Sequence, residues 1–401
     1  MSNIAVSQSA AKKAALRFVL MIGAVSLFAD FAYEGSRSIV GPYVAQLGAT
    51  GTAVGIIAGL GEFLGYALRL VSGKLSDKTG AYWPITLFGY GIQMISVPLL
   101  ALAGSWQIAA LLIVVERIGR ATRNPPRDVM LSNAGNIIGF GWAFGLNEAL
   151  DQTGAMIGPL SVAAVLGMHG QYKMAFAMLL IPALITLTLL VAARLLYPRP
   201  EEMEAHTLDL HTTNLPRVFW IYLIGAALVA AGFPDFSMMS FYFEKANTVS
   251  DTWIPILYAL AMGTSGLGSL VFGKLFDHKG LGILIPLTLI TVPFVPLVFL
   301  GGFYAVLVGC ALWGMGMGVH ESIVAAAVSK MVPLQRRASA YGIFSTAYGI
   351  SWFLGSAVIG FLYDRSLPAL IAFSVGAELA AIPFFFIVAR KEKGFIAEKN
   401  A

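Results

Sequence analysis

The sequence predicts an all-α integral membrane protein with twelve transmembrane helices, built as two six-helix bundles that a pseudo-twofold axis relates. Of its 401 residues, 58% are hydrophobic and 12% are charged, whereas a soluble domain has about 25% charged residues. Apolar runs of about 20 residues, the length needed to cross a bilayer, recur along the chain. One motif between such runs occurs twice, at 73–80 and at 273–280.

The apolar runs are the predicted transmembrane helices, and only brief polar breaks separate them. The one sizeable polar segment, 196–216, falls at the midpoint of the chain. We therefore expect an N-terminal six-helix bundle at 1–195, a cytoplasmic linker at 196–216 and a C-terminal six-helix bundle at 217–401. The twelve runs are 17–45, 51–72, 83–103, 107–122, 138–168, 171–195, 217–243, 252–272, 281–301, 303–330, 340–363 and 367–390.

Basic residues alternate from loop to loop, and this pattern predicts the orientation. The termini, the linker and the breaks after the second, fourth, eighth and tenth runs hold most of them. Arg120, Arg123 and Arg127 are assigned to the break after the fourth run. The positive-inside rule then places both termini and the linker in the cytoplasm of a multi-pass protein of the cell (inner) membrane. The first run is too long for a cleavable signal, and the single Cys310 excludes a disulfide framework.

The two halves align beyond the doubled motif. Asp30 in the first run matches Asp235 in the seventh, within Phe-x-Asp-Phe in both, and Glu116 matches Glu321 at the same offset. Repeats related by an axis along the membrane normal place a substrate site between the halves near the bilayer midplane.

The motif at 73–80 reads G-x-L-x-D-K-x-G and resembles the signature of the major facilitator superfamily, G-x-L-x-D-R-x-G-R-R, without its closing basic residues. The segment 154–159, G-x-x-x-G-P, is similar to the family's helix 5 signature, without the closing glycines. The family's helix 4 Arg is not kept, since Val115 stands four residues before Gly119. The resemblance covers nearly all of the chain.

This resemblance implies a secondary transporter that works by alternating access, and the helix 5 motif is typical of exporters that act as antiporters. The runs at 30–34 and 123–128 also resemble a bacterial subfamily of exporters, some linked to metal resistance. Asp77 is expected to cap the start of the eleventh run through its helix dipole, and Asp277 to act on the fifth. The residues expected to gate are Gly73, Asp77, Gly80, Gly154, Gly158, Pro159, Gly273, Asp277 and Gly280.

Ionisable residues inside apolar runs are unfavourable by at least ~2.5 kcal/mol, so each needs a partner or a polar cavity. Asp30, Glu34 and Arg37 share one face of the first run, with Tyr33 beside them. Two interpretations remain open. The acids bind a proton or a cation, because desolvation favours the protonated carboxyl, or Glu34 and Arg37 form a structural pair.

The fifth and seventh runs add further acids. Glu148 and Asp151 lie one turn apart, just before the Gly-Pro motif, although Glu148 alternatively pairs with Arg117 or Arg120. Asp235 follows Pro234, which breaks the seventh run, and transporters coordinate ions at such breaks.

The tenth run holds His320 and Glu321, a titratable pair of which only one faces the cavity, because neighbours on a helix point about 100° apart. Arg117 either reaches a proton-coupling acid or pairs with Asp77. The candidates for substrate or proton binding are Asp30, Tyr33, Glu34, Arg37, Glu116, Arg117, Asn147, Glu148, Asp151, Asp235, Trp313, His320, Glu321, Tyr348 and Trp352.

The expected function is proton-coupled export of a cationic or amphipathic small molecule, because the acids inside the runs outnumber the bases. A divalent metal exporter is the alternative, with His320, Asp30 and Asp235 as ligands and no thiolate. An integral membrane enzyme ranks lower, because the chain lacks H-E-x-x-H, G-x-S-x-G and a P-loop. We expect a monomer in the lipid bilayer, without cofactor or nucleic acid, and with protons as the coupling ion.

Overall fold

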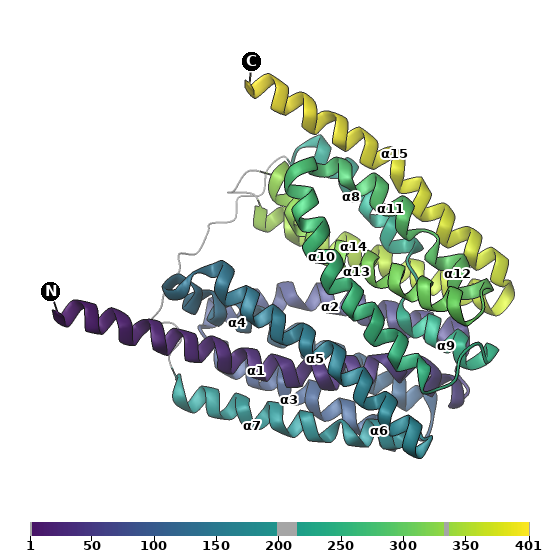
Figure 1. The fold of residues 1–401 in the computed structure, drawn as a ribbon, viewed down its shortest axis with the longest axis horizontal. Coiled ribbons are helices and arrows are strands. Elements are labelled where there is room, and N and C mark those ends of the chain that lie inside the picture. The colour runs from purple at the N-terminus through teal and green to yellow at the C-terminus, as the bar shows by residue number, and fades with distance from the viewer. Residues whose placement is uncertain (1, 199–214, 333–336, 401) are drawn as a thin grey trace. The chain divides into compact units, whose positions relative to one another are not determined.

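A computed structural model of the protein describes residues 2–198, 215–332 and 337–400, and the side chains within these ranges except those of 2–11, 140–141, 169, 277, 319–326, 329–330, 337–339 and 392–400. Every regular element in these ranges is a helix (Figure 1). The all-α prediction is therefore confirmed.

Each predicted run corresponds to one helix or to consecutive short helices. In the first half these are α1 (Ser2–Gln46), α2 (Gly51–Thr79), α3 (Tyr82–Leu99) with the 3₁₀ turn η1 (Leu100–Leu102), α4 (Trp106–Ile138), α5 (Phe140–His169), α6 (Tyr172–Met178) and α7 (Leu180–Leu196). In the second half they are α8 (Arg217–Gly232), α9 (Phe236–Ala246), α10 (Trp253–Lys279), η3 (Gly280–Ile283), α11 (Leu284–Thr291), α12 (Phe294–Leu300), α13 (Phe303–Met331), α14 (Arg337–Arg365) and α15 (Leu367–Asn400).

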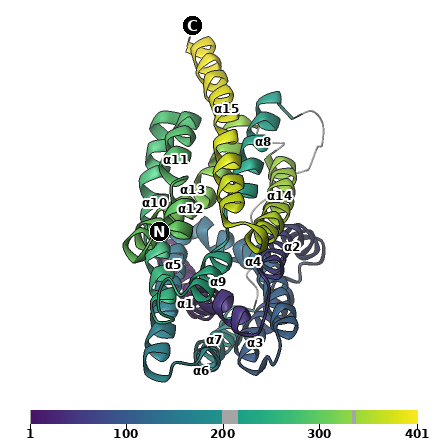
Figure 2. The ribbon, with the colours of Figure 1, turned by 90° about the vertical axis from the view of Figure 1, so that its right-hand side faces the viewer.

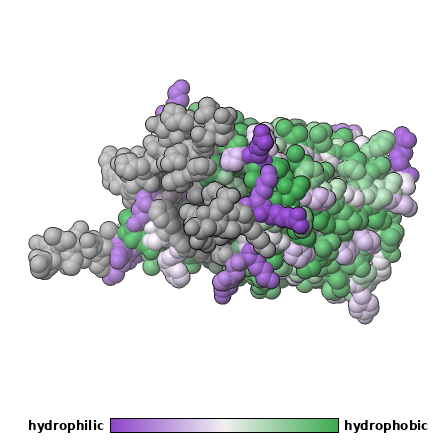
Figure 3. Space-filling model, turned by 90° about the horizontal axis from the view of Figure 1, so that it is seen from above, coloured by the Kyte–Doolittle hydropathy of each residue, from purple (hydrophilic) through white to green (hydrophobic). Residues whose placement is uncertain are grey.

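Ten helical spans in the described residues are long and apolar enough to cross a membrane, and α13 adds a shorter apolar stretch, Phe303–Gly318. Leu102, Leu195 and Leu270 are 78%, 76% and 75% exposed, as lipid-facing side chains would be. Figure 3 shows one face on which hydrophobic residues (green) cover most of the coloured surface.

Helix α4 differs from its prediction. The run was expected to end at 122, with Arg123 and Arg127 in a loop, and this was wrong because α4 continues to Ile138. Pro125 has no N–H to bond the carbonyl of Ala121. The hydroxyl of Ser72 on α2 donates to that carbonyl over 3.1 Å instead, so the helix passes through the proline with this group satisfied.

The chain packs as two compact units. The first unit contains 1–37 and 67–207, and the second unit contains 38–66 and 208–401. The boundary passes through α1 and α2, so 38–66, which the sequence assigns to the N-terminal bundle, packs with helices of the C-terminal half.

In the first unit, glycines let helices approach closely. A Cβ at Gly154 or Gly158 of α5 would collide with the backbone of α1 at Leu27 and Phe31, which agrees with the close packing expected from the G-x-x-x-G motif. Gly119 of α4 likewise lies against the α3 backbone.

In the second unit, α10 lies along α13 and α8 along α15 (Figures 1 and 2). The first half of α2 is attached to α14. A Cβ at Gly55 would collide with the carbonyl of Ser356. The carboxylate of Asp364, at the end of α14, accepts hydrogen bonds from the N–H groups of Gly51 (2.8 Å) and Thr52 (2.7 Å) and from the Thr52 hydroxyl (2.6 Å). Asp364 thereby caps α2.

In both copies of the doubled motif, a glycine with positive φ follows the helix. Gly80 follows the end of α2 and Gly280 follows the end of α10, and each has φ +64°. Glycine adopts this left-handed conformation at no steric cost. The two copies therefore share the conformation of this glycine, whereas only the second is followed by a 3₁₀ turn, η3.

Candidate functional site

The first unit contains a network of buried charged side chains, which we call the buried network. Asp30 and Glu34 of α1 are 8% and 6% exposed, and Glu116, Arg117 and Arg123 of α4 are 6%, 7% and 1% exposed. Charges at this depth need partners, and they find them on neighbouring helices.

Arg123 is the centre of this network. Its Nε donates to Oε1 of Gln93 (2.6 Å), Nη1 to the Tyr90 hydroxyl (2.7 Å) and Nη2 to Oδ1 of Asp30 (3.4 Å). Its guanidinium carbon lies 4.2 Å from the centre of the Tyr90 ring. The close approach of α3 and α4 at Gly89, where a Cβ would lie 2.8 Å from the Arg123 Cβ, makes these contacts possible.

The network continues along α4. Gln93 also donates to Oε1 of Glu116 (2.9 Å), and Nε of Arg117 lies 3.7 Å from the other Glu116 oxygen. Arg117 donates to the Tyr33 hydroxyl. Arg120 lies 4.0 Å above the Tyr33 ring, with Nη2 3.9 Å from Glu34.

The structure gives contacts for Glu34, Arg117 and Glu148, three residues with open interpretations. Glu34 forms an ion pair with Arg120, and Arg117 contacts Tyr33 and Glu116. Glu148 accepts a hydrogen bond from Gln152 (2.9 Å).

The buried network itself holds no excess of acids. Its carboxylates are matched in number by guanidinium groups, namely Asp30, Glu34 and Glu116 against Arg117, Arg120 and Arg123. Arg37, 7% exposed, adds a further positive charge on α1. The buried network therefore has no net negative charge to attract a cation.

A pocket of about 430 Å³ in the first unit is different, and we call it the acidic pocket. Its lining residues come from α4 and α5 and are Arg127, Asp128, Phe144, Gly145, Asn147, Glu148 and Asp151. Three carboxylates and one guanidinium give this lining a formal charge of −2. Glu148 is exposed, whereas the Asp151 side chain is 13% exposed.

Arg127 is held mainly by its neighbour in the chain. Its Nε and Nη2 donate to Oδ1 of Asp128 (3.0 and 2.9 Å), and Nη1 donates to the Ser26 hydroxyl (3.1 Å). Nη1 is 3.9 Å from Oδ2 of Asp151, which accepts a hydrogen bond from Asn147 (3.1 Å). The other Asp151 oxygen, Oδ1, is buried without a hydrogen-bond partner among the described residues.

The predicted break in the seventh run is confirmed between α8 and α9. Asp235 is 2% exposed and caps α9, its Oδ1 accepting from the Ser237 N–H (2.8 Å). The indole of Trp313 donates to the Pro234 carbonyl (2.9 Å). Trp313, fully buried, thus holds the break and lines neither the acidic pocket nor the small cavity described next.

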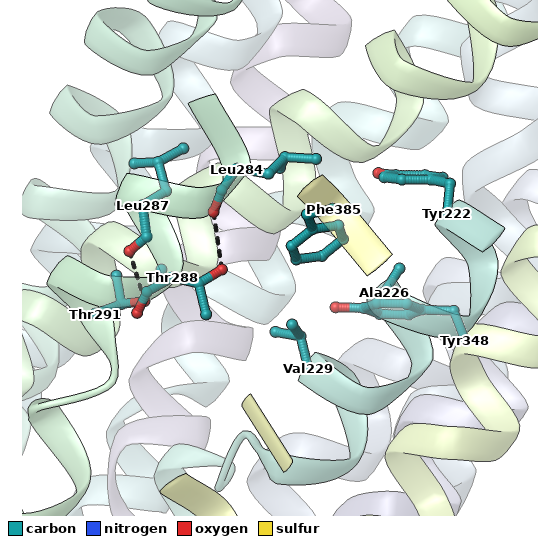
Figure 4. A pocket seen from close by; sticks show the side chains of 10 residues that line it. Tyr222, Ala226, Val229, Leu284, Leu287, Thr288, Thr291, Tyr348 and Phe385 are labelled. Atoms are coloured by element: carbon teal, nitrogen blue, oxygen red, sulfur yellow. Dashed lines mark hydrogen bonds between the residues drawn. The ribbon is translucent and has the colours of Figure 1, made fainter. Parts of the chain in front are cut away.

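Of the other aromatic candidates, Tyr348 lines a small cavity in the second unit (Figure 4). Trp352 is 3% exposed and its ring centre is 5.8 Å from that of Tyr348 and 6.0 Å from that of Phe233. It belongs to an aromatic cluster within the second unit.

The remaining gating and metal candidates are located as follows. Asp77 is exposed near the end of α2. Pro159 lies inside α5, and Gly73 and Gly273 lie inside α2 and α10. The side chains of Asp277, His320 and Glu321 lie outside the described residues. Among the residues that are described, no group of three or more His, Cys, Asp or Glu side chains could hold a metal ion.

Arg123, Tyr90 and Gln93 were not predicted from the sequence as site residues. A signal existed, because Gln93 is a polar residue inside an apolar run and follows Gly89 by one helical turn. This signal does not indicate which neighbouring helix packs against the face that carries Gly89 and Gln93.

Comparison with known proteins gives the family. Residues 21–356 match the model described as Major Facilitator Superfamily. An uncharacterised protein of Mycobacterium tuberculosis is 38% identical over 396 residues, which are 96% of this chain and 97% of that protein. An uncharacterised MFS-type transporter of Methanocaldococcus jannaschii is 26% identical over 381 residues, 91% of this chain and 92% of that protein.

Solved structures agree in fold. The crystal structure of the nucleoside transporter NupG has a TM-score of 0.71 at 15% identity and covers 94% of this chain and 99% of that one. A bacterial homologue of the human lysosomal transporter Spinster, in an inward-facing and unoccupied conformation, has a TM-score of 0.70 at 14% identity and covers 94% and 97%. Because the family model spans most of the sequence and the helices and doubled motif agree with it, the chain belongs to the Major Facilitator Superfamily and is a multi-pass secondary transporter.

Proposed function

We propose that the protein is a proton-coupled exporter of a cationic or amphipathic organic molecule, which binds in the acidic pocket. The observation that carries this proposal is the pocket's charge, with Asp128, Glu148 and Asp151 against Arg127 alone. Its volume of about 430 Å³ falls in the range of small-molecule sites, about 300–1,000 Å³. Phe144 adds an apolar surface for the organic part of such a ligand.

Asp151 is the proposed coupling residue. Arg127 is engaged by two hydrogen bonds to Asp128 and lies 3.9 Å from Asp151, so it only partly neutralises Asp151. The buried Oδ1 atom has no hydrogen-bond partner among the described residues, and protonation of the carboxyl would relieve its desolvation. A proton and a cationic substrate then compete for one carboxylate, which is the requirement for exchange.

The remaining parts of the proposal rest on the sequence. The helix 5 motif at 154–159 favours export by alternating access, and the charge pattern favours cytoplasmic termini in an inner membrane. We propose a monomer of two six-helix bundles, with Asp77 and Asp277 as gating residues. The transporter family favours this function over an enzyme.

A divalent metal is the less supported substrate. Zinc ligands must converge to about 2.0–2.2 Å from one centre. The three pocket carboxylates do not form such a group, whereas an organic cation needs only a diffuse negative surface.

The test is proton movement in proteoliposomes that contain a pH-sensitive dye, with a panel of organic cations and divalent metals. At least one organic cation should drive proton flux with the unmodified protein. Asp151→Asn should lower that flux at least about tenfold, equivalent to about 1.4 kcal/mol, while Asp251→Asn, in the turn before α10, should leave it unchanged. Unchanged flux in Asp151→Asn, or a response to metals alone, would contradict the proposal.

A further inference from the structure

Like Asp151 in the first unit, one acid of the second unit has a buried carboxyl oxygen without a hydrogen-bond partner among the described residues. Glu378 of α15 is 1% exposed, and its Oε1 has no hydrogen-bond partner among the described residues. The hydroxyl of Ser374, one turn earlier on α15, is also buried without a partner there. A buried carboxylate without a partner is unfavourable by several kcal/mol, so this carboxyl requires a proton or another cation.

Glu378 lies beside the end of α8. A Cβ added to Gly232, the last residue of α8, would lie 2.8 Å from the Ser374 carbonyl oxygen and 3.2 Å from the Glu378 nitrogen. The last carbonyls of a helix have no partner within it, and this end carries about half a negative charge. The unpaired carbonyls and the negative helix end both disfavour the ionised form of the Glu378 carboxyl, so they favour its protonated form.

Among the described side chains, Glu378 has no ion pair that would neutralise it. The elements that pack against α15 are η3, α8, α11, α12 and α14. Their charged residues stand at helix ends. Arg217 begins α8, about 22 Å from Gly232 along the axis at 1.5 Å per residue. Arg365 ends α14 just before Leu367, which begins α15 about 16 Å from Glu378 along that helix. Besides Glu378, the charged and titratable residues of these elements and of α15 are Arg217, Tyr222, Arg337, Tyr341, Tyr348, Tyr363, Asp364, Arg365, Arg390, Lys391, Glu392, Lys393, Glu398 and Lys399.

A cavity in the second unit lies beside α8, and Glu378 is not itself among its lining residues. Val229, one turn before Gly232, lines it together with Thr288, Thr291 and Tyr348 (Figure 4). The cavity measures about 40 Å³, and a water needs about 10–15 Å³ by this measure, so two or three waters fit. The hydroxyls of Thr288 and Thr291 donate to carbonyls of α11 and keep lone pairs for such waters.

We propose that Glu378 is a proton-binding site of the second unit, whose proton exchanges with water from this cavity. The site takes a proton because protonation needs only the carboxyl itself, whereas a metal cation needs several oxygen ligands around it. It goes beyond the proposed function, since it uses neither the acidic pocket nor the transported molecule.

The test is labelling of the full-length protein with dicyclohexylcarbodiimide, an apolar reagent that reacts with protonated carboxyls. The carboxyl O–H adds across one C=N bond, and the product rearranges to a stable N-acylurea that peptide mass spectrometry locates. Labelling of Glu378 should be present in mildly acidic buffer and fall at least about tenfold as the pH is raised, because the reagent requires the protonated carboxyl. Glu378→Asp should keep the adduct and Glu378→Gln should lose it.

Three results would overturn the proposal. One is an absence of adduct at Glu378 in the unmodified protein while Asp151 is labelled in the same sample. Another is labelling that does not change with pH, because the proton would then not exchange. The third is protection by sodium at constant pH, which would assign the site to a metal cation. Since each residue gives its own peptide, failure at Glu378 is distinguishable from failure at Asp151.

Discussion

Replacing Asp30 with Asn tests whether the buried network depends on charge balance. The carboxylate lies 3.4 Å from Nη2 of Arg123, which is 1% exposed. Two unit charges at this distance attract by about 5 kcal/mol at an effective dielectric constant of 20, and removing one partner of a buried pair typically destabilises a protein by about 3–5 kcal/mol. Asn keeps the shape and one acceptor, while Gln93 and Tyr90 still hold Arg123. We therefore expect a loss of about 3 kcal/mol.

Thermal unfolding in detergent, followed by tryptophan fluorescence, measures this loss. For a unit of about 150–250 residues, 1 kcal/mol shifts the midpoint by about 2–4 °C, so Asp30→Asn should melt about 6–12 °C lower. The double variant Asp30→Asn, Arg123→Gln should lose less unfolding free energy than the two single variants lose in sum, by about 1–3 kcal/mol. The control Arg194→Gln, exposed on α7, should change stability by less than about 0.5 kcal/mol. Additivity of the two single changes would refute the reasoning.

Three further predictions use the same unfolding measurement or a thiol reagent. Asp364→Ala removes three hydrogen bonds from the start of α2 and should lower the free energy of unfolding by about 1–2 kcal/mol. Asp364→Asn should retain part of the cap and lose less stability. Equal losses in the two variants would contradict a cap that depends on hydrogen bonds from this side chain. Gly158→Ala should destabilise by about 1–3 kcal/mol because its Cβ meets the α1 backbone, whereas Gly91→Ala, with open space around it, should be neutral or slightly stabilising. Cys310, the single cysteine and fully buried, should react with a maleimide only as the protein unfolds, and reaction at room temperature would show that α13 opens locally.

Sequence reasoning predicted the helices well where the signal was local. Apolar length predicts a membrane span because the bilayer imposes it, and all twelve runs correspond to helices. The break at Pro234 was predicted because proline lacks an N–H. The position where the fourth helix ends was not predicted. Helix α4 continues past Pro125, and the Ser72 hydroxyl of α2 donates to the Ala121 carbonyl that Pro125 cannot bond.

The candidate site was predicted only in part for the same reason. Asp30, Glu34, Glu116 and Arg117 were identified because an isolated charge in an apolar run is conspicuous. Glu378 carries the same signal and was missed.

The sequence by itself determined the membrane class, the helices, the doubled motif and the charges that need partners, because hydrophobic length, proline and glycine act within a few residues. Only the tertiary structure decided which charges neutralise one another. It placed Arg123 in the interior beside Asp30, and left Asp151 and Glu378 each with an unpartnered oxygen among the described residues. The physical reason is that the energy of a buried charge depends on side chains brought from distant parts of the chain, and helix packing alone brings them together.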